Sequence, residues 1–231
     1  MNLKTLYDFL KKYLRKIVLY IRSKNEKIYF KKLRKRNKNP NPTIIGNNCI
    51  AGVIYHNLGI KYYSPTINLY FSNDGKEYLD FVRDIKYYST CQMEDITEEE
   101  NKPFPVGRLI PKDSTHNPVR VYFMHYKTYE QAHKKWVERF KRVNYDNIFY
   151  LWEVYNDNDA FDESLVKTFD KLPLKKMSLL HKNIDGLEHS FILKCYEKDY
   201  AVAKVLLHKG FLRISAKRNL DDFDYVSFLN S

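Results

Sequence analysis

The sequence has few cysteines, no long apolar run and no His-Glu-x-x-His or Gly-x-Ser-x-Gly motif. Cys49, Cys91 and Cys195 are too few and too widely spaced for a disulfide framework or a Cys-x-x-Cys metal site, which fits a reducing compartment. A bilayer span needs ~20 apolar residues, and charges interrupt the apolar positions near the N-terminus, unlike those of a signal peptide. We therefore expect a chain that is neither exported nor embedded in a membrane.

What is present is the composition of an ordinary folded protein. The 231 residues are 44% hydrophobic, 16% aromatic and 29% charged, which excludes the disordered, collagen-like and disulfide-stapled classes. The basic excess lies at one end of the chain. Residues 1–40 contain 14 Lys and Arg against only Asp8 and Glu26, a net charge of +12, and residues 41–231 contain 26 basic and 26 acidic side chains.

The basic N-terminal segment has the pattern of an amphipathic helix. Its apolar residues recur every three or four positions and form one stripe: Leu3, Tyr7, Leu10, Leu14, Ile17 and Ile21. A second basic run, residues 31–36, leads into an Asn- and Pro-rich segment at residues 37–42 that ends any helix. The sequence therefore predicts a helical arm over residues 1–40 and a separate domain over residues 41–231.

Three interpretations of this arm compete. It can lie on an anionic membrane surface, with the apolar stripe inserted and each Lys or Arg adding about 1 kcal/mol of attraction. It can instead pack against its own domain or another copy of the chain. Nucleic-acid binding is the least favoured, because polybasic arms bind phosphate backbones but residues 41–231 contain no recognition motif.

Residues 41–231 alternate short apolar runs with helical patterns. Strands are predicted at residues 43–46, 67–71, 119–124, 148–152, 176–180, 191–195 and 211–214, with a long connection at residues 89–118. Helices are predicted between many of them, including one near residues 200–208. This alternation favours a three-layer α/β domain with a mostly parallel, open, Rossmann-like sheet, preceded by the basic amphipathic helix.

In an open parallel sheet, ligands bind beyond the carboxyl ends of the strands. Polar residues that directly follow a predicted strand are therefore the candidate site. They are Asn47, Asn48, Cys49, His125, Tyr126 and His181, and Arg108 in the long connection can reach the same edge. Asn47 and Asn48 also suit a simple helix cap.

His125 is the best candidate for a general base. Cys49 can act as a nucleophile if His125 lies within hydrogen-bond reach, although a free cysteine is commonly an inert small apolar residue. Arg139 and Arg142 share a helical face with Lys135 and are candidates for phosphate binding, with a solvated charged face as the plain alternative.

Asp157 and Asp159 form an Asp-x-Asp pair that can hold a divalent metal, but their surroundings are ordinary loop sequence. We therefore assign no metal site, and the sequence identifies no cofactor.

Several short motifs occur together in an order that is typical of one bacterial group. They are Thr43-Ile-Ile-Gly-Asn-Asn-Cys49, Tyr63-Ser-Pro-Thr66, Phe104-Pro-Val-Gly107, Val121-Tyr-Phe-Met-His-Tyr126 with Trp136 and Arg139, and Asp224-Tyr-Val-Ser-Phe-Leu-Asn230. Over roughly residues 42–231 the chain resembles the domain-of-unknown-function family 1919, often labelled exopolysaccharide biosynthesis protein. The resemblance implies an α/β fold and a role in building capsule or other surface polysaccharide. The sequence departs from the family at Ile50-Ala51-Gly52, where a glycine-rich turn with an aromatic residue is usual. The basic arm lies outside the resemblance.

Together these observations predict a cytoplasmic protein that is peripheral at the inner face of the plasma membrane. We expect a transferase or modifying enzyme, such as a glycosyl- or acyl-group transferase, that acts on a nucleotide-linked or lipid-linked sugar. In this hypothesis His125 is the base, Asn47 and Asn48 orient the substrate, and Arg139 with Arg142 binds phosphate. The alternatives are a non-enzymatic module for polysaccharide assembly or regulation and a basic nucleic-acid-binding protein.

Overall fold

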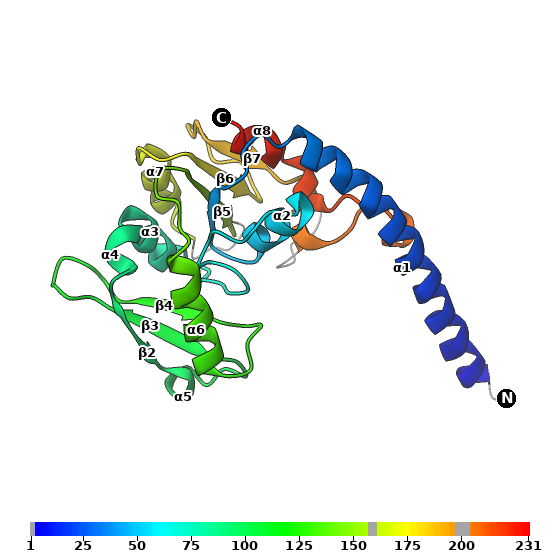
Figure 1. The fold of residues 1–231 in the computed structure, drawn as a ribbon, viewed down its shortest axis with the longest axis horizontal. Coiled ribbons are helices and arrows are strands. Elements are labelled where there is room, and N and C mark those ends of the chain that lie inside the picture. Colours follow the sequence, from blue (N-terminus) through cyan, green and yellow to red (C-terminus); the bar gives the residue numbers. More distant parts are fainter. Residues whose placement is uncertain (1–2, 157–160, 197–203) are drawn as a thin grey trace. The chain divides into compact units, whose positions relative to one another are not determined.

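A computed structural model describes residues 3–156, 161–196 and 204–231 of the chain (Figure 1). It has two units. The helical unit comprises residues 1–38, 57–59 and 193–231, and the sheet unit comprises residues 39–56 and 60–192. The predicted α/β class, the parallel sheet and the N-terminal helix are confirmed.

Helix α1 (Leu3–Arg36) is one continuous element of 34 residues, and it ends where the Asn- and Pro-rich segment begins. Only its second half is packed, with Phe30 and Leu33 buried. Arg36 pairs with Asp224, and Arg34 donates a hydrogen bond to the carbonyl of Asn57. The other elements of this unit are the helix α8 (Tyr225–Leu229) and the 3-10 helices η1 (Lys194–Tyr196), η2 (Lys204–Leu206), η3 (Phe211–Arg213) and η4 (Asn219–Asp222).

The sheet unit is built on four parallel strands in the order β1-β5-β6-β7. They are β1 (Thr43–Gly46), β5 (Ile148–Val154), β6 (Lys176–Leu180) and β7 (Ser190–Ile192). The burial of all four β1 residues and of six of the seven in β5 explains why these strands read as continuous apolar runs. Because all four strands run in the same direction, their carboxyl ends lie along one edge.

A second, antiparallel sheet was not predicted. Its order is β2-β3-β4, formed by β2 (Gln92–Asp95), β3 (Val106–Ile110) and β4 (Val119–Tyr122). The interpretation of residues 89–118 as a plain connection is therefore wrong, and β4 does not belong to the parallel sheet. Short polar strands such as β2, with one buried residue of four, give little apolar alternation for sequence analysis to detect.

The predicted strand at residues 67–71 is also wrong, but this segment connects the two sheets. Asn68 has a left-handed backbone (φ 64°), which breaks an extended run. The two residues Tyr70 and Phe71 form hydrogen bonds with both sheets. Tyr70 forms a single antiparallel bridge with Tyr122 at the end of β4, and the amide of Phe71 donates to the carbonyl of Asn47 at the end of β1.

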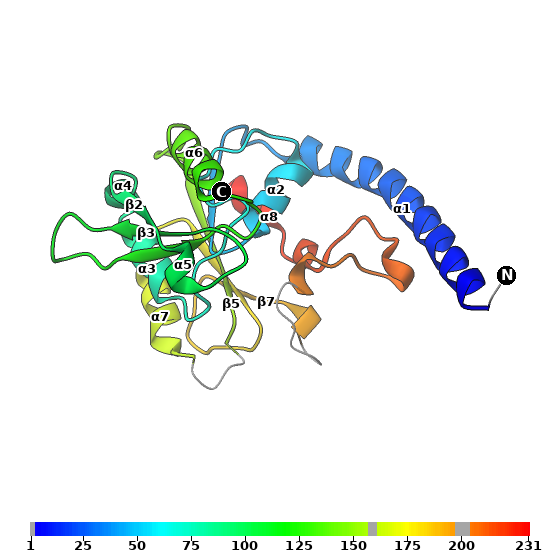
Figure 2. The ribbon, with the colours of Figure 1, turned by 90° about the horizontal axis from the view of Figure 1, so that it is seen from below.

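Helices cover these sheets and complete the core. They are α2 (Ile50–Leu58), α3 (Lys76–Arg83), α4 (Ile85–Tyr88), α5 (Thr97–Glu100), α6 (Tyr129–Phe140) and α7 (Glu163–Lys171). Helix α3 packs on β4 and α7, and α6 packs on β3 (Figure 2). The side chains of α3 and α6 meet those of β5 in one aromatic cluster that includes Tyr78, Phe81, Trp136 and Trp152.

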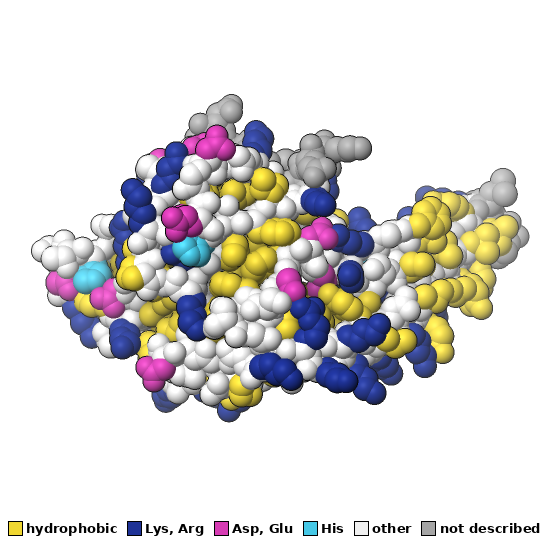
Figure 3. Space-filling model, turned by 90° about the horizontal axis from the view of Figure 1, so that it is seen from above, with side chains coloured by type: hydrophobic (Ala, Val, Ile, Leu, Met, Phe, Trp, Pro, Cys, Tyr) yellow, Lys and Arg dark blue, Asp and Glu magenta, His cyan; other side chains and the backbone are white. Residues whose placement is uncertain are grey.

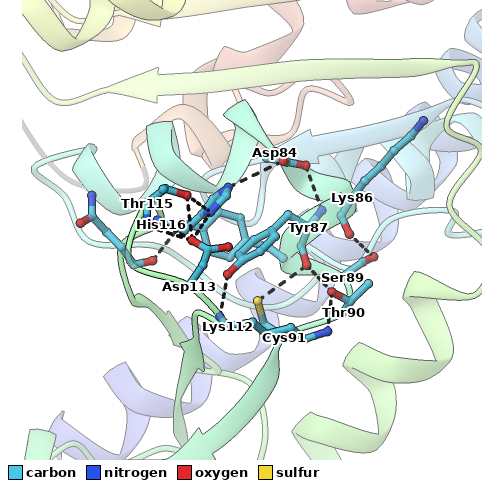
Figure 4. A network of polar contacts seen from close by, with 12 residues as sticks. Asp84, Lys86, Tyr87, Ser89, Thr90, Cys91, Lys112, Asp113, Thr115 and His116 are labelled. Atoms are coloured by element: carbon cyan, nitrogen blue, oxygen red, sulfur yellow. Dashed lines mark hydrogen bonds and ion pairs between the residues drawn. The ribbon is translucent and has the colours of Figure 1, made fainter.

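A polar network fastens the connection between β3 and β4 to α4 (Figure 4). The rings of Tyr87 and His116 stack with centroids 3.6 Å apart, and the Tyr87 hydroxyl accepts a hydrogen bond from the Lys112 amide at 2.6 Å. His116 lies between two carboxylates, Asp113 and Asp84. The hydrogen bond with His116 keeps the pKa of the Asp113 carboxyl below its usual value. This part of the connection therefore has a defined structure.

The C-terminal part departs most from the predicted strands. Strand β7 ends at Ile192, and Lys194 and Cys195 belong to a 3-10 helix. Residues 211–214 also start with a 3-10 helix instead of a strand, because Leu212 and Arg213 have positive φ angles. Of the helix predicted near residues 200–208, residues 200–203 lie outside the described residues, and residues 204–206 form only a single 3-10 turn.

Gly75 permits the packing of Trp152 on β5. Its φ is +80°, and an added Cβ would lie 2.1 Å from Cζ2 of Trp152. We expect Gly75→Ala to lower the free energy of unfolding by about 2 to 4 kcal/mol, from left-handed strain together with overpacking.

Urea unfolding measures this loss. The matched control is Gly186→Ala, which has the same backbone strain (φ +81°) but no atom within 4 Å of the new Cβ. Equal decreases in the free energy of unfolding for the two variants would show that Trp152 is not tightly packed against this turn.

Candidate functional site

Polar side chains gather where three parallel strands end. Asn47 and Asn48 follow β1, Tyr155 follows β5 and His181 follows β6. All contact the last part of β5 at one residue, Glu153. The expectation that residues following β1 and β6 lie at one edge is therefore met, and the common partner is a residue that sequence analysis missed.

Glu153 is a fully buried carboxylate at the centre of this cluster. Its Oε2 accepts a hydrogen bond from Asn48 Nδ2 at 2.6 Å and lies 3.4 Å from the Tyr155 hydroxyl. Its Oε1 lies 3.5 Å from His181 Nε2. Side chains alternate along a strand, so Glu153 faces away from the aromatic cluster that Trp152 and Val154 enter. Several polar partners around a buried charge offset its desolvation.

Asn47 ties β1 to β5 beyond the last paired residues of the two strands. Its Oδ1 accepts from the amide of Glu153 at 2.9 Å, and its Nδ2 donates to the carbonyl of the same residue at 3.0 Å. Both polar atoms of this buried side chain are thus engaged with backbone. The contacts are structural, and a role of Asn47 in orienting a substrate stays a prediction.

Asn48 has three partners at once. Its Oδ1 accepts from the amide of Ile50, the first residue of α2, and its Nδ2 donates to Glu153 and to the Tyr155 hydroxyl. Of the capping weighed in the sequence analysis, the structure shows this one bond from Asn48 to the first helical amide, and the bond does not exclude a site role. The bond also holds the side chain so that its amide nitrogen faces the carboxylate.

His181 is buried, and its ring meets the edge of the Tyr155 ring with centroids 5.1 Å apart. Asn156 holds the backbone here, because its Oδ1 accepts from the amides of His181 and Lys182. The carboxyl ends of β5 and β6 are thereby locked together. Glu153, Tyr155 and Asn156 come directly after the predicted strand at residues 148–152, so their position at a strand end was a usable sequence signal for them.

Cys49 and His125 lie in contact although 76 residues separate them. Cys49 Sγ is 3.5 Å from His125 Nε2, which meets the geometric condition for a Cys-His pair. His125 is exposed and Cys49 is partly buried. Burial, with a smaller contribution from the negative charge of Glu153, raises the pKa of the Cys49 thiol to about 11. The thiol is therefore protonated at neutral pH, and a nucleophilic role would require His125 to take its proton.

The three arginines of the predicted site have different surroundings. Arg139 lies in α6, and its Nη1 donates to the hydroxyl of Tyr126 at 2.7 Å and to the carbonyl of Ile67 at 2.9 Å. Arg142 lies near Tyr55, whose hydroxyl bonds the start of β1, at the opposite end of that strand from the cluster. Arg108 lies on β3 and pairs with Glu94 and Glu99.

Within residues 3–156, 161–196 and 204–231, no group of three or more His, Cys, Asp and Glu side chains is arranged to hold a metal ion. Asp157 and Asp159 lie outside the described residues, so the structure does not describe the Asp-x-Asp pair.

The raised pKa of Cys49 gives a direct chemical test. We expect iodoacetamide to alkylate Cys49 slowly at pH 7 and faster as the pH approaches 11, because only the thiolate reacts. Glu153→Gln removes the negative charge that helps to raise this pKa, so alkylation of Cys49 at pH 9 should become faster.

Peptide mass spectrometry separates Cys49 from the other thiols. Cys91 is the internal control, because burial raises its pKa without a contribution from Glu153. The alkylation rate of Cys91 should therefore be the same in the Glu153→Gln variant and the wild-type protein. Alkylation of Cys49 at pH 7 as fast as that of a free peptide cysteine would contradict the assignment.

Comparison with known proteins places this geometry in a family. The model of the family "Domain of unknown function (DUF1919)" matches residues 19–230. The match starts earlier than the resemblance over residues 42–231 had indicated, so the second half of α1 is part of the family region. A protein of Haemophilus influenzae described as uncharacterized is 30% identical over 199 residues, which are 86% of this chain and 88% of that protein. The chain therefore belongs to the DUF1919 family.

Proposed function

We propose that this protein is a transferase or modifying enzyme that acts on a hydroxyl group of a nucleotide-linked or lipid-linked sugar. The observation that carries the proposal is the convergence of Asn48, Glu153 and His181 at the carboxyl edge of a parallel sheet, with His125 and Cys49 beside them. The setting in surface polysaccharide biosynthesis rests on the resemblance described above.

The exposed imidazole of His125 and the partly buried amide of Asn48 suit a polyhydroxylated ligand. These two groups can donate and accept hydrogen bonds, as a sugar ring requires. Glu153 is buried and holds Asn48, so its role is to position that side chain. His125 is exposed, so an imidazole able to accept a hydroxyl proton is within reach of solvent and ligand.

Arg139 supplies a site for a phosphate group of the sugar donor. Its two hydrogen bonds to described residues both come from Nη1, which leaves Nη2 and Nε to grip a phosphate oxygen. The Tyr126 hydroxyl orients this guanidinium next to the turn that carries His125. The position of Arg142 near the opposite end of β1 gives it no comparable support.

We expect His125→Ala to lower surface polysaccharide output to below a tenth of the wild-type value in cells that depend on this protein. The reason is that removal of a general base typically costs 10² to 10⁴ in rate. The output is measured as cell-surface polysaccharide per cell, with protein amount checked by immunoblot.

His116→Ala is the matched control, since His116 is a histidine of the same unit that belongs to the α4 network. It should leave output unchanged. Full output from a stable His125→Ala protein would contradict the enzymatic role and favour the non-enzymatic binding module.

We further propose that α1 attaches the protein to an anionic membrane surface at the cytoplasmic face. Large apolar side chains of its first half are exposed: Leu6, Tyr7, Phe9, Leu10, Tyr13, Leu14, Ile17, Leu19, Tyr20 and Ile21. Basic side chains alternate with them, and Figure 3 shows hydrophobic and basic side chains next to each other along the helix. No helix among the described residues is long and apolar enough to cross a membrane, so the helix would lie in the interface.

Flotation with vesicles tests this attachment. We expect the full chain to float with vesicles of 30% phosphatidylserine in phosphatidylcholine and not with pure phosphatidylcholine. Lys11→Gln with Lys12→Gln and Lys16→Gln should weaken binding about 100-fold, at about 1 kcal/mol per charge. Leu10→Gln with Leu14→Gln and Ile17→Gln should weaken it at least tenfold without a charge change.

Gln is a good helix former, so circular dichroism should report the same helix content in both variants. If the lysine variant fails to bind vesicles while the variant without the three apolar residues binds normally, the contact is purely electrostatic. Salt-sensitive retention on DNA without flotation would favour the nucleic-acid interpretation.

A further inference from the structure

The helical unit exposes a second apolar element besides α1. Phe211 is 83% exposed and Leu212 is 48% exposed, the former being the most exposed large apolar side chain among the described residues. They stand side by side in η3, after Gly210 and before Arg213. Packing within the described part of the chain does not explain two adjacent large apolar side chains this exposed.

The backbone of this segment is held in a strained conformation. Leu212 has φ 52° and Arg213 has φ 57°, a left-handed geometry that is unfavourable for side chains with a Cβ. Arg213 itself bonds back to Gly210, which closes the turn. Strained backbone of this kind persists only where the surrounding structure holds it, and here it coincides with two exposed apolar side chains, Phe211 and Leu212.

Helix α1 fixes this turn in place. Arg22 Nε donates to the carbonyl of Arg213 at 2.7 Å, and Asn25 Nδ2 donates to the carbonyl of Ile214 at 3.1 Å. These bonds come from the middle of α1, directly after the stretch whose apolar side chains are exposed. The loop is therefore bonded to the middle of α1, and Figure 1 shows the orange segment beside this helix.

We propose that residues 210–214 form a second membrane-inserting element, in which Phe211 and Leu212 enter the boundary between headgroups and acyl chains of an anionic bilayer. The proposal rests on the membrane attachment proposed for α1 and adds a contact that fixes the orientation of the helical unit. One amphipathic helix can roll about its axis on a membrane, whereas a helix and a separate anchored loop cannot.

Charge favours a bilayer over a second copy of this chain. Residues 1–40 carry a net charge of +12, Arg213 is part of the loop, and Lys217 follows it closely in sequence. Two such surfaces repel each other, but the same charge is attracted to phosphatidylserine headgroups. Basic residues next to an exposed aromatic side chain are the composition of interfacial anchors.

Phe211→Trp reports insertion directly. Trp136 and Trp152, the two native tryptophans, are 4% and 2% exposed in the core of the sheet unit, so they contribute a constant background. With 30% phosphatidylserine vesicles, we expect the fluorescence emission of the introduced tryptophan to shift to shorter wavelength and to be quenched by brominated acyl chains. The control is Tyr62→Trp, an exposed aromatic position of the sheet unit that should show neither effect.

Phe211→Ser with Leu212→Asn removes the apolar side chains, and Asn tolerates the left-handed backbone. This variant should bind vesicles at least fivefold more weakly, with unchanged thermal unfolding. Normal flotation of this double variant, together with unshifted emission from the Phe211→Trp protein, would overturn the loop proposal and leave the attachment through α1 intact. Failure of the wild-type chain to float would overturn both, and a dimer that dissociates in the double variant without vesicles would assign the surface to a second copy.

Discussion

The common direction of the four sheet strands is the constraint on which the candidate site depends. It brings the residues that follow β1, β5 and β6 to one edge, and the register places Gly46 beside Leu151 and Val154 beside Leu180. The Asn47 side chain then continues the pairing of β1 with β5 by bonding both backbone groups of Glu153. The next residue, Asn48, then lies against the Glu153 carboxylate.

The second determinant is the short segment that joins the two sheets. Tyr70 pairs with Tyr122, and Phe71 bonds to Asn47, so the end of β4 is held beside the end of β1. That arrangement places His125 on Cys49 although β4 belongs to another sheet. Glu153 connects this pair to the cluster electrostatically, because its charge helps to keep the Cys49 proton in place.

The two units carry different parts of the proposed function. The sheet unit contains the polar cluster and the Cys49-His125 pair. The helical unit contains most of the exposed large apolar residues together with most of the excess positive charge. An enzyme that acts on a lipid-linked sugar benefits from attachment to the surface where that substrate resides, since attachment raises the local concentration. The family match includes residues 19–36, so the packed half of α1 is part of the same family region as the sheet unit.

The sequence alone determined the elements whose signals are local: α1 and its end, the apolar strands β1, β5 and β6, and the polar residues that follow β1 and β6. These depend on periodicity, on proline and on strand-end rules. The antiparallel sheet, the burial of Glu153, the contact of Cys49 with His125 and the exposure of Leu212 in a left-handed turn came from the tertiary structure. Each of these depends on groups far apart in the chain, such as the 76 residues between Cys49 and His125, and the periodicity of one segment carries no information about its distant partner.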